Sequence, residues 1–283
     1  MKVIEVKGLV KSYGDFTAVA GIDLTIETGE IFALLGPNGA GKTTTVEILA
    51  GFRSADSGLV SVLGFDPATK GDAARAWRNR IGIVLQTASD AGSFKVHEIV
   101  KHFSNFYANP RDVDQVIEAV GLSAKRDSLV LELSGGQRRR LDVALGIIGS
   151  PELLFLDEPT TGFDPEARRA FWSLIRDLKA GGTTILLTTH YLDEAEELAD
   201  RVAVITAGKI IEVSTPALLG GRSTAKATVS WMGPTGIQSE ESDNPTAVVA
   251  KLAAQFSGEI PELTITRPSL EDIYLKMIGG HHE

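Results

Sequence analysis

The chain has 283 residues, of which 43% are hydrophobic and 23% charged, as expected for a globular protein with a substantial core. Its formal net charge of −9 argues against an extended nucleic-acid surface, although a local basic groove would be compatible with it. The sequence contains no cysteine, which excludes disulfides, zinc–thiolate sites and cysteine nucleophiles.

Neither a signal peptide nor a membrane-spanning helix is predicted. The N-terminal sequence MKVIEVKGLVKSYG lacks the apolar core of a signal peptide. No uninterrupted apolar stretch reaches the roughly 18 residues that suggest a transmembrane helix. If the protein works at a membrane, we therefore expect another chain to span it.

The first 213 residues read as an α/β domain. Alternating polarity around residues 3–6 and 22–26 predicts antiparallel strands near the N-terminus. Short continuous apolar runs then predict buried parallel strands at residues 31–35, 81–85, 153–156, 185–189 and 202–205. Helical patterns separate them at residues 42–50, 165–179 and 193–199. This alternation indicates a parallel sheet flanked by helices.

Two regions depart from that alternation. Residues 88–149 are helical in pattern, with candidate helices at 98–107 and 113–120, and predict a helical subdomain inserted between two core strands. Residues 214–283 predict a small α+β accessory domain. Its expected elements are a strand at 226–231, a helix at 245–256, a strand at 263–266 and a helix from 268. The acidic stretch SEESDN, residues 239–244, is predicted to be a solvated turn.

The segment GPNGAGKTTT fits the phosphate-loop pattern G-x-x-x-x-G-K-[ST]. It follows the apolar run IFALL and opens a helix, so backbone N–H groups can surround phosphate oxygens. Lys42 is expected to reach the β- and γ-phosphates, and the Thr43 hydroxyl to bind Mg²⁺. The alternative is a glycine-rich turn that matches by chance. The predicted nucleotide contacts are Gly36, Pro37, Asn38, Gly39, Ala40, Gly41, Lys42, Thr43 and Thr44.

A second motif, LLFLDEP, places two acids at the end of an apolar run. A buried strand of this kind delivers Asp157 to the sheet edge where nucleotide-binding proteins hold Mg²⁺. Glu158 is the candidate to accept a proton from the attacking water. A strand that merely ends in solvated acids is the alternative, but the pairing with the phosphate loop favours a P-loop NTPase.

The segment LSGGQ, residues 133–137, lies about twenty residues before LLFLDEP. Locally, Ser134 and Gln137 have capping-box spacing, yet two glycines in a first helical turn cost roughly 0.8–1 kcal/mol each relative to alanine. The segment resembles the signature of the ABC ATPase family. The resemblance implies that Ser134, Gly135, Gly136 and Gln137 contact the ATP bound to the phosphate loop of a second subunit.

Other positions match family elements by order and spacing. Gln86 corresponds to the Q-loop glutamine that senses Mg²⁺ and the attacking water, and His190 to the switch histidine at the γ-phosphate. Asp164, in TTGFDP, falls in the D-loop that crosses the dimer interface, with Phe163 replacing the usual leucine. Tyr13 falls where the family stacks an aromatic ring on adenine. Alone, His190 would more simply be a capping histidine and Tyr13 a core residue.

The tail segment RPSLEDIYLKMIG resembles the end of ATPases in the drug- and antibiotic-export branch. The resemblance implies an ATPase that uses ATP and Mg²⁺ and dimerises with a second copy or a paralogous ATPase. It would drive a separate transmembrane permease that exports a drug, antibiotic, lipid or polysaccharide. We expect a peripheral position at the cytoplasmic face of the membrane, contact with the membrane only through the permease, and no nucleic-acid partner. The alternatives are a soluble non-transport ABC ATPase, a P-loop nucleotide kinase and the ATPase of an importer.

The remaining conspicuous residues have structural interpretations. The run Arg138–Arg140 is interpreted as a charged helix face, with contact to a phosphate or a partner as the alternative. Trp77 and Trp172 lie in amphipathic stretches and are expected to be packing residues. His281 and His282 are interpreted as part of a frayed terminus or as remains of an expression tag.

Overall fold

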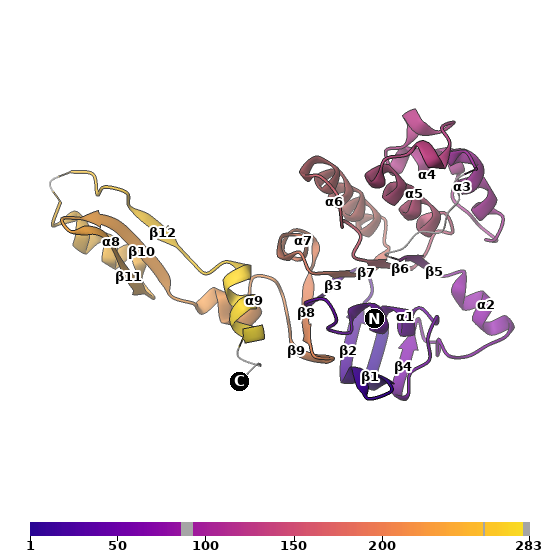
Figure 1. Cartoon of the computed structure of the whole chain (residues 1–283), viewed down its shortest axis with the longest axis horizontal. Coiled ribbons are helices and arrows are strands. Elements are labelled where there is room, and N and C mark those ends of the chain that lie inside the picture. Colours follow the sequence, from indigo (N-terminus) through magenta and orange to yellow (C-terminus); the bar gives the residue numbers. More distant parts are fainter. Residues whose placement is uncertain (86–92, 257, 280–283) are drawn as a thin grey trace. The chain divides into compact units, whose positions relative to one another are not determined.

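The computed structural model describes residues 1–85, 93–256 and 258–279 (Figure 1). Its chain divides into two compact units, Met1–Val213 and Ser214–Glu283, which are described in turn.

An antiparallel sheet forms the N-terminal part of the first unit. It contains β1 (Lys2–Tyr13), β2 (Phe16–Glu27) and β4 (Ser57–Val62), in the order β2-β1-β4. Alternating side chains of β1 and β2 enter the core, as their sequence pattern predicts. Strand β4 was not predicted, because most of its residues are exposed or only half-buried and it forms an edge of the sheet.

A six-stranded sheet forms the centre of the first unit, in the order β5-β6-β7-β3-β8-β9. Its strands are β3 (Ile31–Leu35), β5 (Ile81–Val84), β6 (Leu153–Asp157), β7 (Thr184–Thr189), β8 (Arg201–Thr206) and β9 (Lys209–Ser214). The strands from β5 to β8 pair in parallel, and every residue of β3, β6 and β7 is buried. The predicted parallel strands are thereby confirmed. Because β6, β7 and β3 are neighbours, the three loops that follow them leave the sheet at one edge.

Helices connect these strands (Figure 1): α1 (Lys42–Leu49), α2 (Asp72–Arg78), α6 (Pro165–Ala180) and α7 (Leu192–Leu198). The aromatic ring of Trp77 on α2 stacks on Phe65 with centroids 5.5 Å apart, and its indole N–H donates to the carbonyl of Val62 at 3.0 Å. Its interpretation as a packing residue is confirmed.

The chain segment that connects β5 to β6 forms a group of helices: α3 (Val96–Ser104), α4 (Val113–Ala119) and α5 (Gly135–Ile147). Short 3₁₀ turns occupy Ser123–Lys125 and Val130–Glu132. Helix α5 begins with the predicted capping box. The Ser134 hydroxyl accepts from the N–H of Gln137 at 3.3 Å, and the Gln137 side chain accepts from the N–H of Ser134 at 3.0 Å.

The second unit is a small α+β structure. It contains a 3₁₀ segment (Leu219–Thr224), β10 (Ala227–Gly233), β11 (Gly236–Ser242), α8 (Pro245–Ala253), β12 (Thr264–Thr266) and α9 (Leu270–Gly279). Its antiparallel sheet has the order β11-β10-β12, and Val229 and Trp231 of the central strand pack in a core with Val248 and Leu252 of α8.

The prediction of a turn at SEESDN is wrong. Strand β11 runs through Ser242 and pairs with β10 along its whole length, while the chain reverses between Gly233 and Gly236. Acidic side chains are compatible with this strand because it lies at a sheet edge and most of its residues face solvent. Asn244 then caps α8, with its side chain accepting from the N–H of Ala247 at 3.2 Å.

Within the residues that the structure describes, no helix combines the length and the apolar character needed to cross a lipid bilayer.

Candidate nucleotide-binding site

The loop between β3 and α1 has a shape that only glycine permits at two of its positions. A Cβ atom at Gly36 would overlap the carbonyl oxygen of Ile205. Gly41 has φ +103°, and a Cβ there would overlap the carbonyl oxygen of Ala18. The loop is therefore tightly enclosed by its own chain, as a cradle for phosphate groups requires.

Lys42, the first residue of α1, turns its side chain back over this loop. Its side chain is 4% exposed, and the ammonium group donates to the carbonyls of Gly36 at 2.8 Å and Pro37 at 3.2 Å. It also lies 3.2 Å from Oε1 of Glu158. A buried cation held at the mouth of the loop is suited to neutralising a bound phosphate.

A carboxylate and two hydroxyls meet beside the loop. Asp157 ends β6 and is 1% exposed. It accepts from the Thr43 hydroxyl at 3.0 Å, and from the hydroxyl of Thr188 on the neighbouring strand β7 at 2.5 Å. Hard oxygen ligands of this kind fit Mg²⁺, which usually takes one or two carboxylates and completes its shell with phosphate and water.

Glu158 follows with a strained backbone, since its φ is +45°. Its N–H group is fixed by the carbonyl oxygen of Thr188 at 3.2 Å and the hydroxyl of Thr188 at 3.0 Å. Its side chain is 9% exposed, with Oε2 lying 3.3 Å from Nδ1 of His190. The acid and the histidine, predicted from separate motifs, are brought together with Lys42.

A cavity of about 390 Å³ collects most of the predicted nucleotide contacts. The predicted residues in its wall are Tyr13, Asn38, Gly39, Gly41, Lys42, Thr43, Thr44 and Glu158. Tyr13 is 40% exposed, so the alternative of a core tyrosine is wrong. The guanidinium of Arg53 lies over its ring at 5.2 Å.

The signature glycines have surroundings unlike those of the phosphate loop. Apart from the adjacent residues and the backbone of its own helix, a Cβ at Gly135 would meet no atom of the described residues within 4 Å, and one at Gly136 would meet only the Cβ of Ala167, at 3.9 Å. Neither glycine has a positive φ. Ser134 and Gln137 are occupied in the capping box, and none of these four residues lines the cavity of the phosphate loop.

Asp164 and Phe163, both in the segment TTGFDP, make contacts within this chain. Asp164 caps α6, its carboxylate accepting from the N–H of Ala167 at 2.7 Å. Phe163 is 8% exposed and packs edge-on against Phe171 at 5.7 Å, so the replacement of leucine keeps the packing. Gln86 lies outside the described residues.

Sequence reasoning missed three residues near the site. Thr188 stands opposite Asp157 in the parallel pairing of β7 with β6, a relation that could be found only by assuming that the two strands are neighbours. Glu194 on α7 is completely buried, and burial raises the pKa of its carboxyl group. Arg139 is 8% exposed and turns inward, so the interpretation of a charged helix face is wrong for this arginine.

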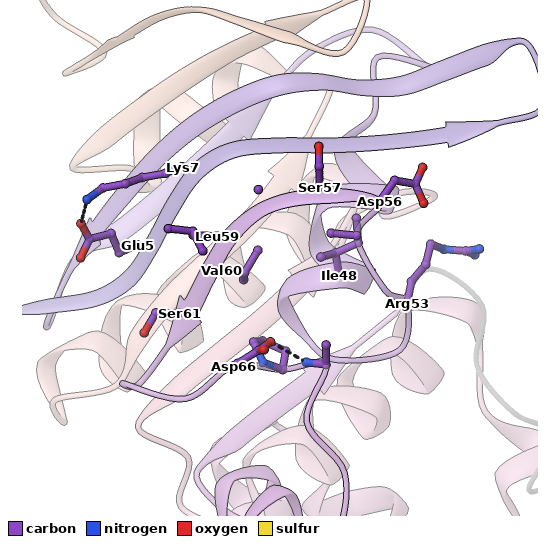
Figure 2. A pocket seen from close by; sticks show the side chains of 14 residues that line it. Glu5, Lys7, Ile48, Arg53, Asp56, Ser57, Leu59, Val60, Ser61 and Asp66 are labelled. Atoms are coloured by element: carbon purple, nitrogen blue, oxygen red, sulfur yellow. Dashed lines mark hydrogen bonds and ion pairs between the residues drawn. The ribbon is translucent and has the colours of Figure 1, made fainter.

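Figure 2 shows a larger cavity, of about 560 Å³, along β4. Of the charged residues in its wall, Glu5, Lys7, Arg53 and Asp56 are already in ion pairs. Glu5 lies 3.1 Å from Lys7, and Asp56 lies 2.6 Å from Lys11. The hydrogen bond from Lys11 lowers the pKa of Asp56, and that from Lys7 lowers the pKa of Glu5. This mixed, internally neutralised surface lacks the features of a triphosphate site.

Comparison with known proteins agrees with this geometry. The ABC transporter family model matches residues 19–161. The daunorubicin/doxorubicin resistance ATP-binding protein DrrA of Streptomyces peucetius is 36% identical over 310 residues, covering 98% of this chain and 93% of that protein. The Nod factor export ATP-binding protein I of Rhizobium sp. (strain N33) is 38% identical over 303 residues, covering 99% and 98%.

Solved structures show the same fold. The chain is similar to cbiO1 from Clostridium perfringens, part of the ABC transporter complex cbiONQ, with a TM-score of 0.68, 29% identity and coverage of 76% of this chain and 89% of that one. A nucleotide-free ATP-binding cassette from an ABC transporter gives a TM-score of 0.66, 27% identity and coverage of 76% and 92%. The chain thus belongs to the ABC transporter family, as an ATP-binding and ATP-hydrolysing subunit.

Proposed function

We propose that this subunit hydrolyses ATP in a head-to-tail pair of ATPase chains and thereby powers export through a separate transmembrane permease. In this arrangement each ATP lies between the phosphate loop of one chain and the signature segment of the other. The second ATPase chain is a further copy or a paralogue. The subunit is then peripheral, held at the cytoplasmic face of the membrane through the permease, with no role in nucleic-acid binding.

The contrast between the two glycine-rich segments carries this proposal. The phosphate loop needs its glycines because its own chain encloses it. Nothing within the described part of the chain requires glycine at 135 or 136, although glycine weakens a helix there. A bare helix N-terminus of this kind admits an anion close to backbone N–H groups. Since the chain already has one phosphate loop, the second anion-binding segment is best explained as serving a neighbour's ATP.

Each of these side chains is assigned a separate role in ATP binding or hydrolysis. Lys42 offsets charge on the β- and γ-phosphates, and Thr43 and Asp157 are the ligands for Mg²⁺, which supplies further charge neutralisation when bound. Glu158 accepts a proton from the attacking water, and His190, in contact with that carboxylate, faces the γ-phosphate. Gln86 is assigned to the metal and the water from its place in the sequence alone. Tyr13 stacks on adenine, and Asp164 lies at the chain–chain interface.

The assignment to export rests on what the relatives are and on how much of this chain they align with. DrrA is a drug-resistance ATP-binding protein, and the Rhizobium relative is an export ATP-binding protein. Both align over nearly the whole chain and so include most of residues 214–283. The cargo class is accordingly a drug, antibiotic, lipid or polysaccharide. An importer ATPase and a soluble non-transport ABC ATPase are the competing assignments.

The variant E158Q tests the paired arrangement. Removal of the general base should lower ATP turnover by about 10²- to 10⁴-fold while leaving ATP bound. Light scattering after gel filtration should then show a dimer with ATP and a monomer without it. A monomer that retains bound ATP would contradict the sandwich. A K42A variant, which should lose ATP binding, is the control for nucleotide-dependent dimerisation.

Co-purification from membranes tests the transport assignment. The full chain, tagged and expressed in its own cells, should be recovered with a multi-helix membrane protein. Recovery of ribosomes or DNA in its place would contradict the assignment to transport. Direction is then decided with the purified complex in vesicles, where accumulation of cargo on the nucleotide side would indicate import.

A further inference from the structure

Arg139 lies one turn into the signature helix α5, and its guanidinium is directed away from solvent. Its Nε donates to the carbonyl oxygen of Pro159 at 3.1 Å and its Nη2 to that of Asp157 at 2.7 Å. Its Nη1 donates to the carbonyl oxygen of Leu85, the residue that precedes Gln86. One planar side chain thus joins α5 to the ends of β5 and β6 and to the segment after β6.

Two of these carbonyls flank Glu158. This residue has φ +45°, a conformation that persists in non-glycine residues only where the surroundings hold it. The N–H of Glu158 is held by Thr188, while Arg139 holds the carbonyls of the residues before and after it. The backbone of the general base is therefore fixed from β7 on one side and from the signature helix on the other.

The guanidinium is committed to these carbonyls and has no carboxylate within hydrogen-bond distance among the described residues. Oδ2 of Asp142 lies 3.8 Å from Nη1. Burial lowers the pKa of Arg139, and the negative charges of Asp142, Asp157 and Glu194 oppose that effect. Arginine–carboxylate pairs in proteins are frequently bidentate. Here each of the three hydrogen bonds goes to a backbone carbonyl at or just after the end of a strand.

We propose that Arg139 is a positioning residue for hydrolysis: it holds the Glu158 backbone in its active conformation and ties it to the helix that contacts the neighbour's ATP. This rests on the proposed function, because it takes Glu158 as the base and α5 as the signature helix. Through the same three hydrogen bonds, the chain's own general base and the residue before Gln86 are coupled to the segment that serves the other nucleotide.

The test compares Arg139 with its neighbour Arg138. The Arg138 guanidinium donates to the carbonyl of Val130 at 2.9 Å, which lies outside the catalytic loops, so R138A removes a similar bond from the same helix. In the full-length protein, R139A should lower kcat by about 10²-fold, as expected when a catalytic group is displaced by about 1 Å. The KM and Kd for ATP should change less than about twofold. R138A should keep kcat within about twofold.

Three further measurements separate positioning from a merely structural role. Guanidinium chloride at millimolar concentration should restore much of the kcat of R139A, and sodium chloride at the same ionic strength should not. R139K, which keeps the charge but not the planar fork, should remain about tenfold slower than the wild type. In single-turnover assays, adding R139A to E158Q should produce little further loss, because Arg139 acts through Glu158.

Several results would overturn the proposal. They are turnover of R139A like that of R138A, an equal loss in kcat and ATP affinity without guanidinium rescue, or a full additional loss in the E158Q background. If R139A does not fold, as judged by circular dichroism and Tm, R139K and the double variant R139K/E158Q give the same comparison. Failure of E158Q to trap a dimer would instead contradict the paired arrangement, and it leaves the Arg139 comparison to decide the positioning role separately.

Discussion

The phosphate loop and the signature segment are both rich in glycine, both lead into a helix and both offer backbone N–H groups, yet their surroundings are opposite. At Gly36 and Gly41 the chain leaves no room for a Cβ atom, whereas at Gly135 a methyl group would meet no described atom within 4 Å beyond its chain neighbours and the backbone of its own helix. One segment is completed by its own chain and the other is open. The difference teaches that glycine in a binding loop can be required either by the fold or by a surface outside the chain, and that substitutions can distinguish the two.

Gly41→Ala should have the largest effect. The added Cβ would overlap the carbonyl oxygen of Ala18, and φ +103° is strained for alanine. We expect a loss of about 1–3 kcal/mol in the free energy of unfolding, with loss of ATP binding by the isolated chain. Urea unfolding and equilibrium dialysis with ATP measure both. Unchanged stability would show that the loop is not enclosed as described.

Gly135→Ala should have a smaller and opposite effect on stability. The position is helical and open, so alanine should raise the free energy of unfolding by about 0.5–1 kcal/mol. ATP binding by the monomer should be unchanged, while turnover should fall at least tenfold, because under the proposed pairing the methyl group would face the neighbour's nucleotide. If turnover is retained, the comparison fails, since the glycine then has no function outside the chain.

Tyr13→Ala should weaken ATP binding about tenfold, since base–aromatic stacking contributes about 1–3 kcal/mol. Tyr13→Phe keeps the ring and should bind ATP within about twofold of the wild type. Both variants should fold normally, because the side chain is 40% exposed. Measuring Kd for ATP and for a triphosphate without a base separates stacking from phosphate binding. Equal weakening for the two ligands would exclude adenine stacking.

Asp142, on the signature helix, should affect stability only at pH values where its carboxyl group ionises. Burial raises its pKa from 3.8 to about 6, so between these values the folded protein binds the proton more tightly than the unfolded chain. Its contribution to stability is fully present below about pH 4 and is lost as the pH rises through 6. Asp142→Asn should therefore be about 1–3 kcal/mol more stable than the wild type at pH 8, and equal to it near pH 3.5.

Urea unfolding at the two pH values measures this difference. Asp114→Asn is the matched control, because a hydrogen bond from Arg126 lowers the pKa of Asp114, and its replacement should not stabilise the protein at pH 8. A stabilisation by Asp142→Asn that is independent of pH would show that burial of the charge is not its cause.

The sequence predicts the parts of the fold in which burial is uniform. Strands β3, β6 and β7 are buried at every residue and contain the apolar runs IFALL, LLFL and ILL, which are visible in the sequence. Strands β4 and β11 are edge strands held by backbone pairing, which places little demand on side chains. The sequences of β4 and β11 therefore lack the hydrophobic pattern from which a strand could be predicted.

The candidate site divides in the same way. Contiguous motifs predict Lys42, Asp157 and Glu158, and the structure brings these residues together. Thr188 and Arg139 act through contacts between segments that are 31 and 18 residues apart from Asp157 along the chain. Arg139 stands between two arginines that are only half-buried, so composition alone could not show that it turns inward.

The opposite surroundings of the two glycine-rich segments also have a genetic consequence. Under the proposed head-to-tail pairing, each ATP site is built from the phosphate loop of one chain and the signature segment of the other. A substitution therefore inactivates one such site and not every site to which its chain contributes. A pair made of one chain with a phosphate-loop lesion and one with a signature lesion has both lesions at the same ATP, and its other site is intact. Two alleles that are each inactive alone should then complement each other in a mixed dimer, whereas two different phosphate-loop alleles should not.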